Sequence, residues 1–291
     1  MKVAGFTFIR NAETYGYPIV EAIESILPLC DEFVVAVGNS TDNTLGLIQQ
    51  IGSPKIRIIH TVWDDNLREG GQVLAQETDK ALAAISPGTD WAFYIQGDEV
   101  LHEQYLDTVR QAMLDNLGNT AVEGLLFRYV HFFGSYRYVG NSRRWYRREI
   151  RVIRPTGQVR SYRDAQGFRK KDNTKLRVKL IDACIFHYGW VKPLALQRAK
   201  HSYFYRFWHG EAGMQRVIKE AEAFSYERNI DSLAEFTGTH PAVMQGRIAA
   251  ADSSFTFDTR IRRYSLRVRL LTAIEQLTGW RIGEYRNYKL R

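Results

Sequence analysis

Two adjacent carboxylates, Asp98 and Glu99, follow an apolar and aromatic run of the sequence and offer its clearest chemistry. Residues 91–95 have the composition of a buried strand, and Gly97 permits a close backbone approach just before the acidic pair. Ligands of open α/β sheets bind outside the carboxyl ends of the strands, where these side chains would emerge. Carboxylate oxygens there suit Mg²⁺ or Mn²⁺, and such an ion suits a substrate diphosphate. The alternative is a surface turn whose acidic residues open the next helix, and for Glu99 both interpretations stay open.

The first 120 residues alternate strand and helix patterns, and these elements would position the carboxylates. The strand at residues 33–37 contains no polar residue, as expected when both faces of a sheet are covered. The βαβαβαβ order predicts an α/β, Rossmann-like fold with a mostly parallel sheet and helices on both faces. The predicted strands are 3–9, 33–37, 56–59 and 91–95, and the predicted helices are 19–27, 45–51, 72–85 and 105–117.

From residue 121 the pattern changes, first to strands and then to helices. We predict one domain at 1–192, in two parts at 1–120 and 121–192, and a basic helical extension at 193–291. The predicted strands are 122–130, 150–154 and 176–186, and the predicted helices are 195–208, 211–229 and 260–277.

Composition is that of an ordinary globular protein, with 45% hydrophobic and 25% charged residues. No apolar run is long enough to span a membrane, and the N-terminal residues are too strand-like for a signal peptide. Cys30 and Cys184 lie in apolar segments without CxxC spacing, so buried free thiols and a cytoplasmic location are expected. The net charge of +8 is uneven: residues 1–127 carry −11 and residues 128–179 carry +13. An acidic half that holds a metal and a basic part that binds an anion would explain this asymmetry.

The loop after the first strand excludes the common phosphate-binding motifs. It contains Arg10, Asn11 and Glu13 in place of G-x-G-x-x-G, and no Walker A sequence occurs. A nucleotide at this sheet would therefore be held by other means, which favours a metal at Asp98.

Three segments in order resemble glycosyltransferase family 2: FIRNAE at 8–13, VVAVGNSTDNT at 34–44 and WAFYIQGDE at 91–99. The resemblance implies a GT-A fold and transfer of a sugar from a nucleotide-sugar, with a UDP-sugar expected, to a hydroxyl of a saccharide or glycoconjugate, with inversion. It also implies a divalent cation, Mg²⁺ or Mn²⁺, and a role such as cell-envelope polysaccharide synthesis. The sequence departs from the family pattern in two places. An acidic pair falls on Val37 and Gly38, and the first Asp of the D-x-D metal motif falls on Gln96.

The resemblance implies that residues 1–192 are the catalytic domain, with a nucleotide-sugar half at 1–120 and an acceptor half at 121–192. It also assigns roles to individual residues. Asp98 matches the second Asp of the metal motif, and Arg10, Asn11 and Glu13 would line the nucleotide pocket. His187 follows a predicted strand, where similar proteins place a metal or diphosphate ligand, although a lone histidine is more often structural. The other histidines (60, 102, 131, 201, 209 and 240) are expected to be structural or exposed.

A general base must remove the proton of the acceptor hydroxyl. The family places an acidic residue between the metal motif and the late histidine, and among Glu149, Asp164 and Asp172 we choose Asp164, which has a glycine and aromatic residues nearby. The alternative is a surface Asp164 paired with Arg160 or Arg163.

Two basic segments have several interpretations. Residues 132–148 interleave arginines with aromatic residues, which fits an acceptor site, a single-stranded nucleic acid surface or a solvated strand pair; we favour the acceptor site and expect no nucleic acid partner. Residues 260–277 form a basic amphipathic pattern that fits either a packed helix or peripheral contact with the inner face of a membrane, where a lipid-linked acceptor would be met. Alternative functions are a catalytically decayed nucleotide-sugar-binding protein and a sugar-phosphate nucleotidyltransferase.

Overall fold

The computed structural model describes residues 1–67, 70–205, 207, 219–251 and 254–291. Its core is a sheet whose first half consists of four parallel strands in the order β4-β1-β2-β3. Every residue of β4 is buried and the other central strands are nearly so, which explains their continuous apolar sequences. These strands are β1 (Val3–Ile9), β2 (Glu32–Val37), β3 (Ile56–His60) and β4 (Trp91–Tyr94).

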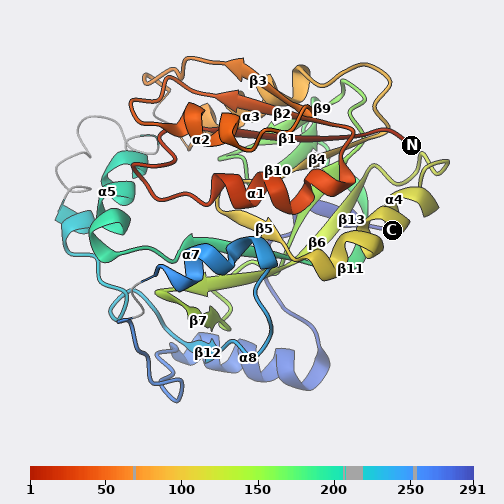
Figure 1. Ribbon diagram of the computed structural model, residues 1–291. Helices are drawn as coiled ribbons and strands as arrows, with labels where there is room; N and C mark the ends of the chain where they lie inside the picture. Colours follow the sequence, from red (N-terminus) through yellow and green to blue (C-terminus); the bar gives the residue numbers. More distant parts are fainter. Residues whose placement is uncertain (68–69, 206, 208–218, 252–253) are drawn as a thin grey trace.

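Helices connect these parallel strands and pack on the sheet (Figure 1). In α1 the apolar residues Ile19, Ile23 and Ile26 recur at helical spacing and are buried. The α/β fold predicted from the sequence is therefore confirmed. The helices are α1 (Ile19–Ile26), α2 (Thr44–Gln50), α3 (Gln72–Ala83) and α4 (Leu106–Asp115).

The second half of the sheet is mixed. Strand β8 runs antiparallel to both β4 and β6, whereas β11 runs parallel to β6 and antiparallel to the short strand β5. The pairing of β11 with β5 returns the chain to the end of β4, so late residues reach the site of the early carboxylates. These strands are β5 (Glu99–Leu101), β6 (Gly124–Phe133), β7 (Ser135–Gly140), β8 (Arg148–Ile153) and β11 (Leu176–Trp190). A separate hairpin consists of β9 (Val159–Tyr162) and β10 (Gly167–Lys170).

The segment after residue 192 contributes helices and two further strands. These are α5 (Leu194–Tyr205), α7 (Gln245–Ala249) and α8 (Leu266–Thr278), with β12 (Leu233–Glu235) paired to β7 and β13 (Tyr288–Leu290) paired to β11. The chain thus returns to the main sheet twice after residue 192 (Figure 1). The division at residue 192 stays a prediction.

The structure excludes one open alternative and corrects two helix predictions. Glu99 begins β5 and is fully buried, so it does not open a helix on the surface. The helix predicted at 211–229 is present at 219–222 but absent from 223–229; residues 211–218 lie outside the described part, as do residues 206 and 208 of the preceding predicted helix. The helix predicted at 260–277 begins only at Leu266, because the Ser265 hydroxyl accepts from Val268 N and caps it there.

Two expectations from the sequence concern membrane-spanning helices and the state of the cysteines. In the described parts of the chain we find no helix with the length and apolar character needed to cross a membrane. Both cysteines are free thiols; Cys30 is buried, and Cys184 is half-buried.

Candidate active site

The site begins where β4 ends and the chain turns from Gln96 to Glu99. Glu99 N donates to Gln96 O at 3.0 Å and closes this turn. A side chain at Gly97 would meet Ile9 at the end of β1, because a Cβ there would lie 2.8 Å from Ile9 Cδ1. Glycine therefore lets the turn pack against the neighbouring strand end, with Asp98 at its tip.

Asp98 lies among positively charged groups. Lys200 Nζ of α5 donates to Asp98 Oδ2 at 3.1 Å and to Gly189 O at 3.2 Å. Burial alone would raise the pKa of Asp98, but the Lys200 ammonium, which also donates a hydrogen bond to the carboxylate, holds it well below its usual range. The Asp98 side chain is only 12% exposed and is nevertheless ionised at neutral pH.

His187 of β11 faces the same carboxylate, with Nε2 at 3.8 Å from Asp98 Oδ1. Its Nδ1 lies 3.2 Å from Nδ1 of His131, which occupies the paired position on β6. Burial lowers the pKa of His131 to about 3, and burial also lowers the pKa of His187, so both imidazoles are neutral at pH 7.

These contacts fix the tautomer of His187. His131 Nε2 lies 2.8 Å from the carbonyl oxygen of Tyr146, and a carbonyl oxygen only accepts, so the proton of neutral His131 is on Nε2. His131 Nδ1 then accepts from His187 Nδ1, which leaves a lone pair on His187 Nε2. This lone pair and the Asp98 carboxylate face each other without a proton between them, an arrangement that a cation would satisfy.

The two groups fit a divalent cation with few protein ligands. A Cβ at Gly189 would lie 2.7 Å from both Asp98 Oδ2 and His187 Nε2, so glycine keeps the space in front of them open. In the ranges that the structure describes, no three His, Cys, Asp or Glu side chains converge as a metal site. Mg²⁺ is commonly bound by one or two protein carboxylates together with water and substrate phosphates, and imidazole is a good ligand for Mn²⁺-type ions. Asp98 and His187 could thus hold such an ion once a diphosphate supplied further oxygens.

Glu99 plays a different part from Asp98. Its carboxylate accepts from Arg151 Nε at 2.8 Å, from Arg151 Nη2 at 2.7 Å and from the Tyr129 hydroxyl at 2.7 Å. Glu99 and Arg151 are both fully buried. Glu99 also accepts from Gln96 N, so the ion pair anchors the turn that carries Asp98.

The loop that follows β1 is joined to the loop that follows β2. Asn11 has a left-handed backbone (φ 54°), and its side-chain oxygen accepts from Thr41 N at 2.8 Å. Glu13 Oε2 accepts from Asn43 N at 3.1 Å. Two segments of the family-like pattern are therefore adjacent. The side chains of Asn11 and Glu13 accept hydrogen bonds from the loop after β2.

Arg10 and Gly38 lie beside an indole ring. Arg10 pairs with Asp65 at 2.9 Å, and its guanidinium lies 5.6 Å from the ring centroid of Trp63. A Cβ at Gly38 would lie 2.4 Å from Trp63 Nε1, so the indole fills the space that a side chain at position 38 would need. This packing explains locally why the acidic residue of the family pattern is absent here.

Asp164 lies in the turn between β9 and β10. Arg163 and Ala165 on either side have left-handed backbones, with φ of 56° and 63°. Such conformations are costly for residues with a Cβ and concentrate at functional sites. The turn touches the site through Gln96 Nε2, which donates to Ala165 O at 3.0 Å. Burial raises the pKa of Asp164, and within the described chain its carboxylate forms no ion pair.

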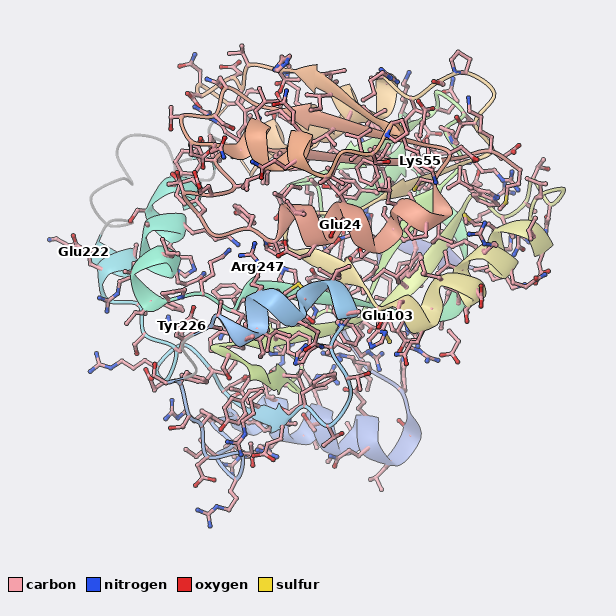
Figure 2. All side chains as sticks on the ribbon, viewed as in Figure 1. Glu24, Lys55, Glu103, Glu222, Tyr226 and Arg247 are labelled. Atoms are coloured by element: carbon pink, nitrogen blue, oxygen red, sulfur yellow. The ribbon has the colours of Figure 1, made fainter. Side chains whose placement is uncertain are left out.

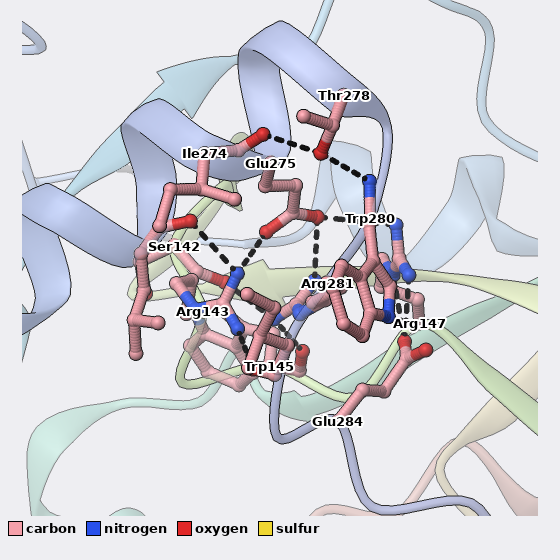
Figure 3. Close-up of polar contacts among 12 residues, drawn as sticks. Ser142, Arg143, Trp145, Arg147, Ile274, Glu275, Thr278, Trp280, Arg281 and Glu284 are labelled. Carbon is pink, nitrogen blue, oxygen red and sulfur yellow. Dashed lines mark hydrogen bonds and ion pairs between the residues drawn. The ribbon is translucent and has the colours of Figure 1, made fainter.

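Part of the basic aromatic segment holds the C-terminal region in place. Glu275 of α8 accepts from Arg143 and, at 3.2 Å, from Arg147, whose Nε also donates to Glu284 at 2.8 Å (Figure 3). Arg143 also donates to Ile282 O. These arginines are therefore paired within the protein, which agrees with a structural interpretation of residues 143–148.

Sequence reasoning missed three participants: Lys200, Lys192 and His131. Lys192 is buried, and its Nζ donates to Gly16 O at 2.9 Å. Nothing local marks the two lysines, which lie about one hundred residues from Asp98 in the chain. His131 could have been found, because two predicted strands each place a histidine near their carboxyl end, but only the register of β6 with β11 makes them neighbours.

No protein-family model and no curated protein matches the chain. The chain is similar to the solved structure of S. aureus TarS in complex with UDP, with 20% identity and a TM-score of 0.34 over 46% of this chain and 37% of that one. A second TarS structure, of residues 1–349, matches over 76% of this chain and 71% of that one, with 14% identity and a TM-score of 0.39.

The chain is also similar to glucosyl-3-phosphoglycerate synthase from Mycobacterium tuberculosis in complex with Mn²⁺, UDP and phosphoglyceric acid. This match has 22% identity and a TM-score of 0.31, and it covers 45% of this chain and 43% of that one. The chain thus spans less than half of the length of these UDP-bound structures.

Proposed function

We propose that this protein transfers a sugar from a nucleotide-sugar, a UDP-sugar in the first instance, to a hydroxyl of a saccharide, glycoconjugate or lipid-linked acceptor, with inversion. The observation that carries the proposal is the pair of Asp98 and His187 at the carboxyl end of β4, with the lone pair of His187 Nε2 directed at the Asp98 carboxylate. This is the position where open α/β sheets bind their ligands.

Different residues of the site would serve different roles in the transfer. Asp98 and His187 would hold a divalent ion, Mg²⁺ or Mn²⁺, which when bound would neutralise the charge of the departing diphosphate. Lys200, at 3.1 Å from Asp98, would add a second positive charge on the same side. Arg10 and the joined loops of Asn11 and Glu13 would form the wall toward the nucleotide.

Asp164 would take the proton from the acceptor hydroxyl. The Gln96–Ala165 hydrogen bond ties its turn to the residue two positions before Asp98. Burial raises the pKa of Asp164, which makes its carboxylate a stronger base than an exposed aspartate. Inversion requires that a general base activates the acceptor hydroxyl on the face of the sugar opposite the leaving diphosphate.

A ligand screen followed by one substitution tests the proposal. Calorimetric titration with UDP and UDP-sugars, with and without Mn²⁺, should show metal-dependent binding, and incubation with acceptors should release UDP. Asp98→Asn should lower transfer more than tenfold, whereas the exposed control Asp182→Asn should leave it unchanged. Binding without transfer would favour a decayed binding protein, and pyrophosphate release from a sugar phosphate and a nucleoside triphosphate would favour a nucleotidyltransferase.

We also propose that α8 contacts an anionic membrane, at the cytoplasmic face. Leu266, Leu270 and Leu277 recur on one side of the helix and are 84%, 63% and 86% exposed, and Trp280 just beyond is 63% exposed. The opposite side carries Glu275, which the arginines of residues 143–147 hold (Figure 3). The helix is therefore docked by its polar side and presents leucines outward.

The neighbouring charges favour a membrane as the partner. Arg262, Arg263, Arg267 and Arg269 flank the leucines and are exposed, so a second copy of this helix would meet like charges whereas anionic lipids would meet opposite ones. Vesicles containing phosphatidylglycerol should sediment the protein and pure phosphatidylcholine vesicles should not. Replacing the three leucines by Gln should abolish sedimentation, with Leu114→Gln as the control. Dimerisation by light scattering without vesicle binding would contradict this proposal.

A further inference from the structure

A large cleft lies beside the candidate active site and is not used by the roles assigned above. Its volume is about 1100 Å³, and its walls come from α1, the start of β7, residues 191–196 and α7 with the turn before it. Figure 2 labels Arg247, which lies between α7 and α1 at this cleft. The cleft is large enough for a substrate of drug size or larger.

Lys192 connects the cleft to the active site. It lines the cleft, and its Nζ lies 4.4 Å from the ring centroid of Tyr17, while Lys200 Nζ lies 4.8 Å from the same ring. One tyrosine therefore separates the lysine that bonds Asp98 from the lysine that faces the cleft. The inner end of the cleft is adjacent to the site of the proposed transfer.

Lys192 has no direct ion pair within the described chain, and the Asp98 carboxylate, which opposes the fall in its pKa, acts only from beyond ion-pair distance. Lys192 is 6% exposed, its one hydrogen-bond acceptor is the neutral carbonyl of Gly16, and within the described chain no carboxylate lies within ion-pair distance of it. Burial, followed by the charge of Lys200, lowers the pKa of Lys192 well below its usual range. A buried ammonium is costly unless it is paired, so an anionic group in the cleft would stabilise it.

The two other cations at the cleft are already paired. Arg247 Nε lies 2.9 Å from Glu21 Oε1, and both residues line the cleft. Arg137 Nη2 lies 2.7 Å from Glu235 Oε1. These pairs leave Lys192 as the lining cation without a direct ion pair in the described chain. The cleft thus has one preferred position for an anion.

The rest of the lining is mainly apolar, with Ser135, Tyr136, His240 and Thr256 as its other polar side chains. Aromatic and aliphatic side chains contribute most of it, and no Asn, Gln or Asp is among the lining residues that the structure describes. Saccharide hydroxyls need such side chains as hydrogen-bond partners, whereas a hydrocarbon chain needs apolar contact. The principal apolar residues are Val191, Leu196, Phe236, Val243, Ile248 and Phe255.

We propose that this cleft binds an anionic amphiphile, with a phosphate headgroup at Lys192 and a hydrocarbon chain along the apolar wall. An ammonium is a good point-charge partner for phosphate, and the chain would cover the aliphatic residues. If the glycosyltransferase proposal holds, this molecule is the acceptor or the lipid carrier of the acceptor, but its binding does not require that function.

Titration with decyl phosphate below its micellar concentration tests the proposal, with decyl maltoside and inorganic phosphate as the two comparison ligands. Decyl phosphate should bind, and each comparison ligand, which lacks either the anion or the chain, should bind at least tenfold more weakly. Lys192→Met should weaken decyl phosphate binding about tenfold or more. Val243→Asn, which leaves Lys192 in place, should weaken it as well. The exposed control Lys179→Met should have no effect.

The alternative outcomes are distinct. If inorganic phosphate binds as tightly as decyl phosphate, the hydrocarbon chain does not contribute and the ligand is not an amphiphile. If decyl maltoside binds as tightly as decyl phosphate, the negative charge has no role. If Lys192→Met weakens UDP binding and leaves decyl phosphate binding intact, Lys192 serves the nucleotide and this inference is wrong. If the unmodified protein binds decyl phosphate but not UDP, the glycosyltransferase proposal is refuted and the cleft remains a lipid site.

Discussion

Nδ1 of His131 lies 3.2 Å from Nδ1 of His187, and this contact decides which nitrogen of His187 faces Asp98. The two residues are paired in the register of β6 and β11, and Tyr146 O fixes the proton of His131 on the far nitrogen. A histidine that was expected to be merely structural thus orients a candidate ligand.

We predict that His131 acts as a positioning residue. His131→Ala should weaken Mn²⁺ binding about 10- to 100-fold, because His187 would lose the partner that fixes its tautomer. His131→Asn retains an acceptor near the Nδ1 position and should recover part of that affinity. Electron paramagnetic resonance of free Mn²⁺ measures the change in the presence of UDP. His60→Asn, at an exposed position, is the control. Equal Mn²⁺ affinity for His131→Ala and the unmodified protein would remove this role.

The assignment of Asp164 as the base leads to a separate prediction. Asp164→Asn should lower the rate of transfer about 10²- to 10⁴-fold, since the hydroxyl proton would lose its acceptor. UDP affinity should remain unchanged because the assignment gives Asp164 no part in donor binding. The exposed Asp172, in the next turn of the chain, provides the matched control Asp172→Asn. A fully active Asp164→Asn variant would show that another group accepts the proton.

The buried pair of Glu99 and Arg151 is expected to matter for folding. Glu99→Gln should lower the free energy of unfolding by about 3–5 kcal/mol, because it leaves the fully buried Arg151 guanidinium without its charge partner. Chemical denaturation monitored by circular dichroism measures this. The exposed pair of Arg260 and Asp258 serves as the comparison, and Arg260→Ala should leave the free energy of unfolding nearly unchanged. Similar losses for both substitutions would contradict the prediction.

Glu149 should make stability fall as the pH rises. Burial raises its pKa from 4.5 to about 7, with the charge of Arg151 acting in the opposite direction. The native state therefore binds more protons than the unfolded state between these values, and stability is lost as the pH rises from about 4.5 through about 7. Glu149→Gln removes this titration and keeps an oxygen for the bond from Gln166, which is 2.8 Å long in the native protein.

The comparison of melting curves at two pH values tests this effect. Relative to the unmodified protein, Glu149→Gln should gain up to about 3 kcal/mol between pH 5 and pH 8. Glu123→Gln is a suitable control, because the pKa of Glu123 is lowered to about 2 and its carboxylate is ionised throughout this range. An equal difference between Glu149→Gln and the unmodified protein at both pH values would show that Glu149 is not protonated in the native state.

The sequence by itself determined the parallel half of the fold and the position of Asp98. Residues 3–9, 33–37 and 91–95 are apolar runs bounded by turn residues, and such local patterns specify strands without reference to the remainder of the chain. The segments that resemble glycosyltransferase family 2 lie at the ends of these strands. Their neighbourhood follows from the rule that the carboxyl ends of parallel strands share one edge.

The tertiary structure decided which side chains complete the site. Lys200 meets Asp98 across 102 positions of the chain, and His131 meets His187 across 56, through a strand register that no periodicity encodes. Arg143 is paired with Glu275, and Arg147 with Glu275 and Glu284, which only the docking of α8 could reveal. Sequence patterns specify how a segment folds locally, whereas the burial and charge of Lys192 depend on segments that pack together only in the folded protein.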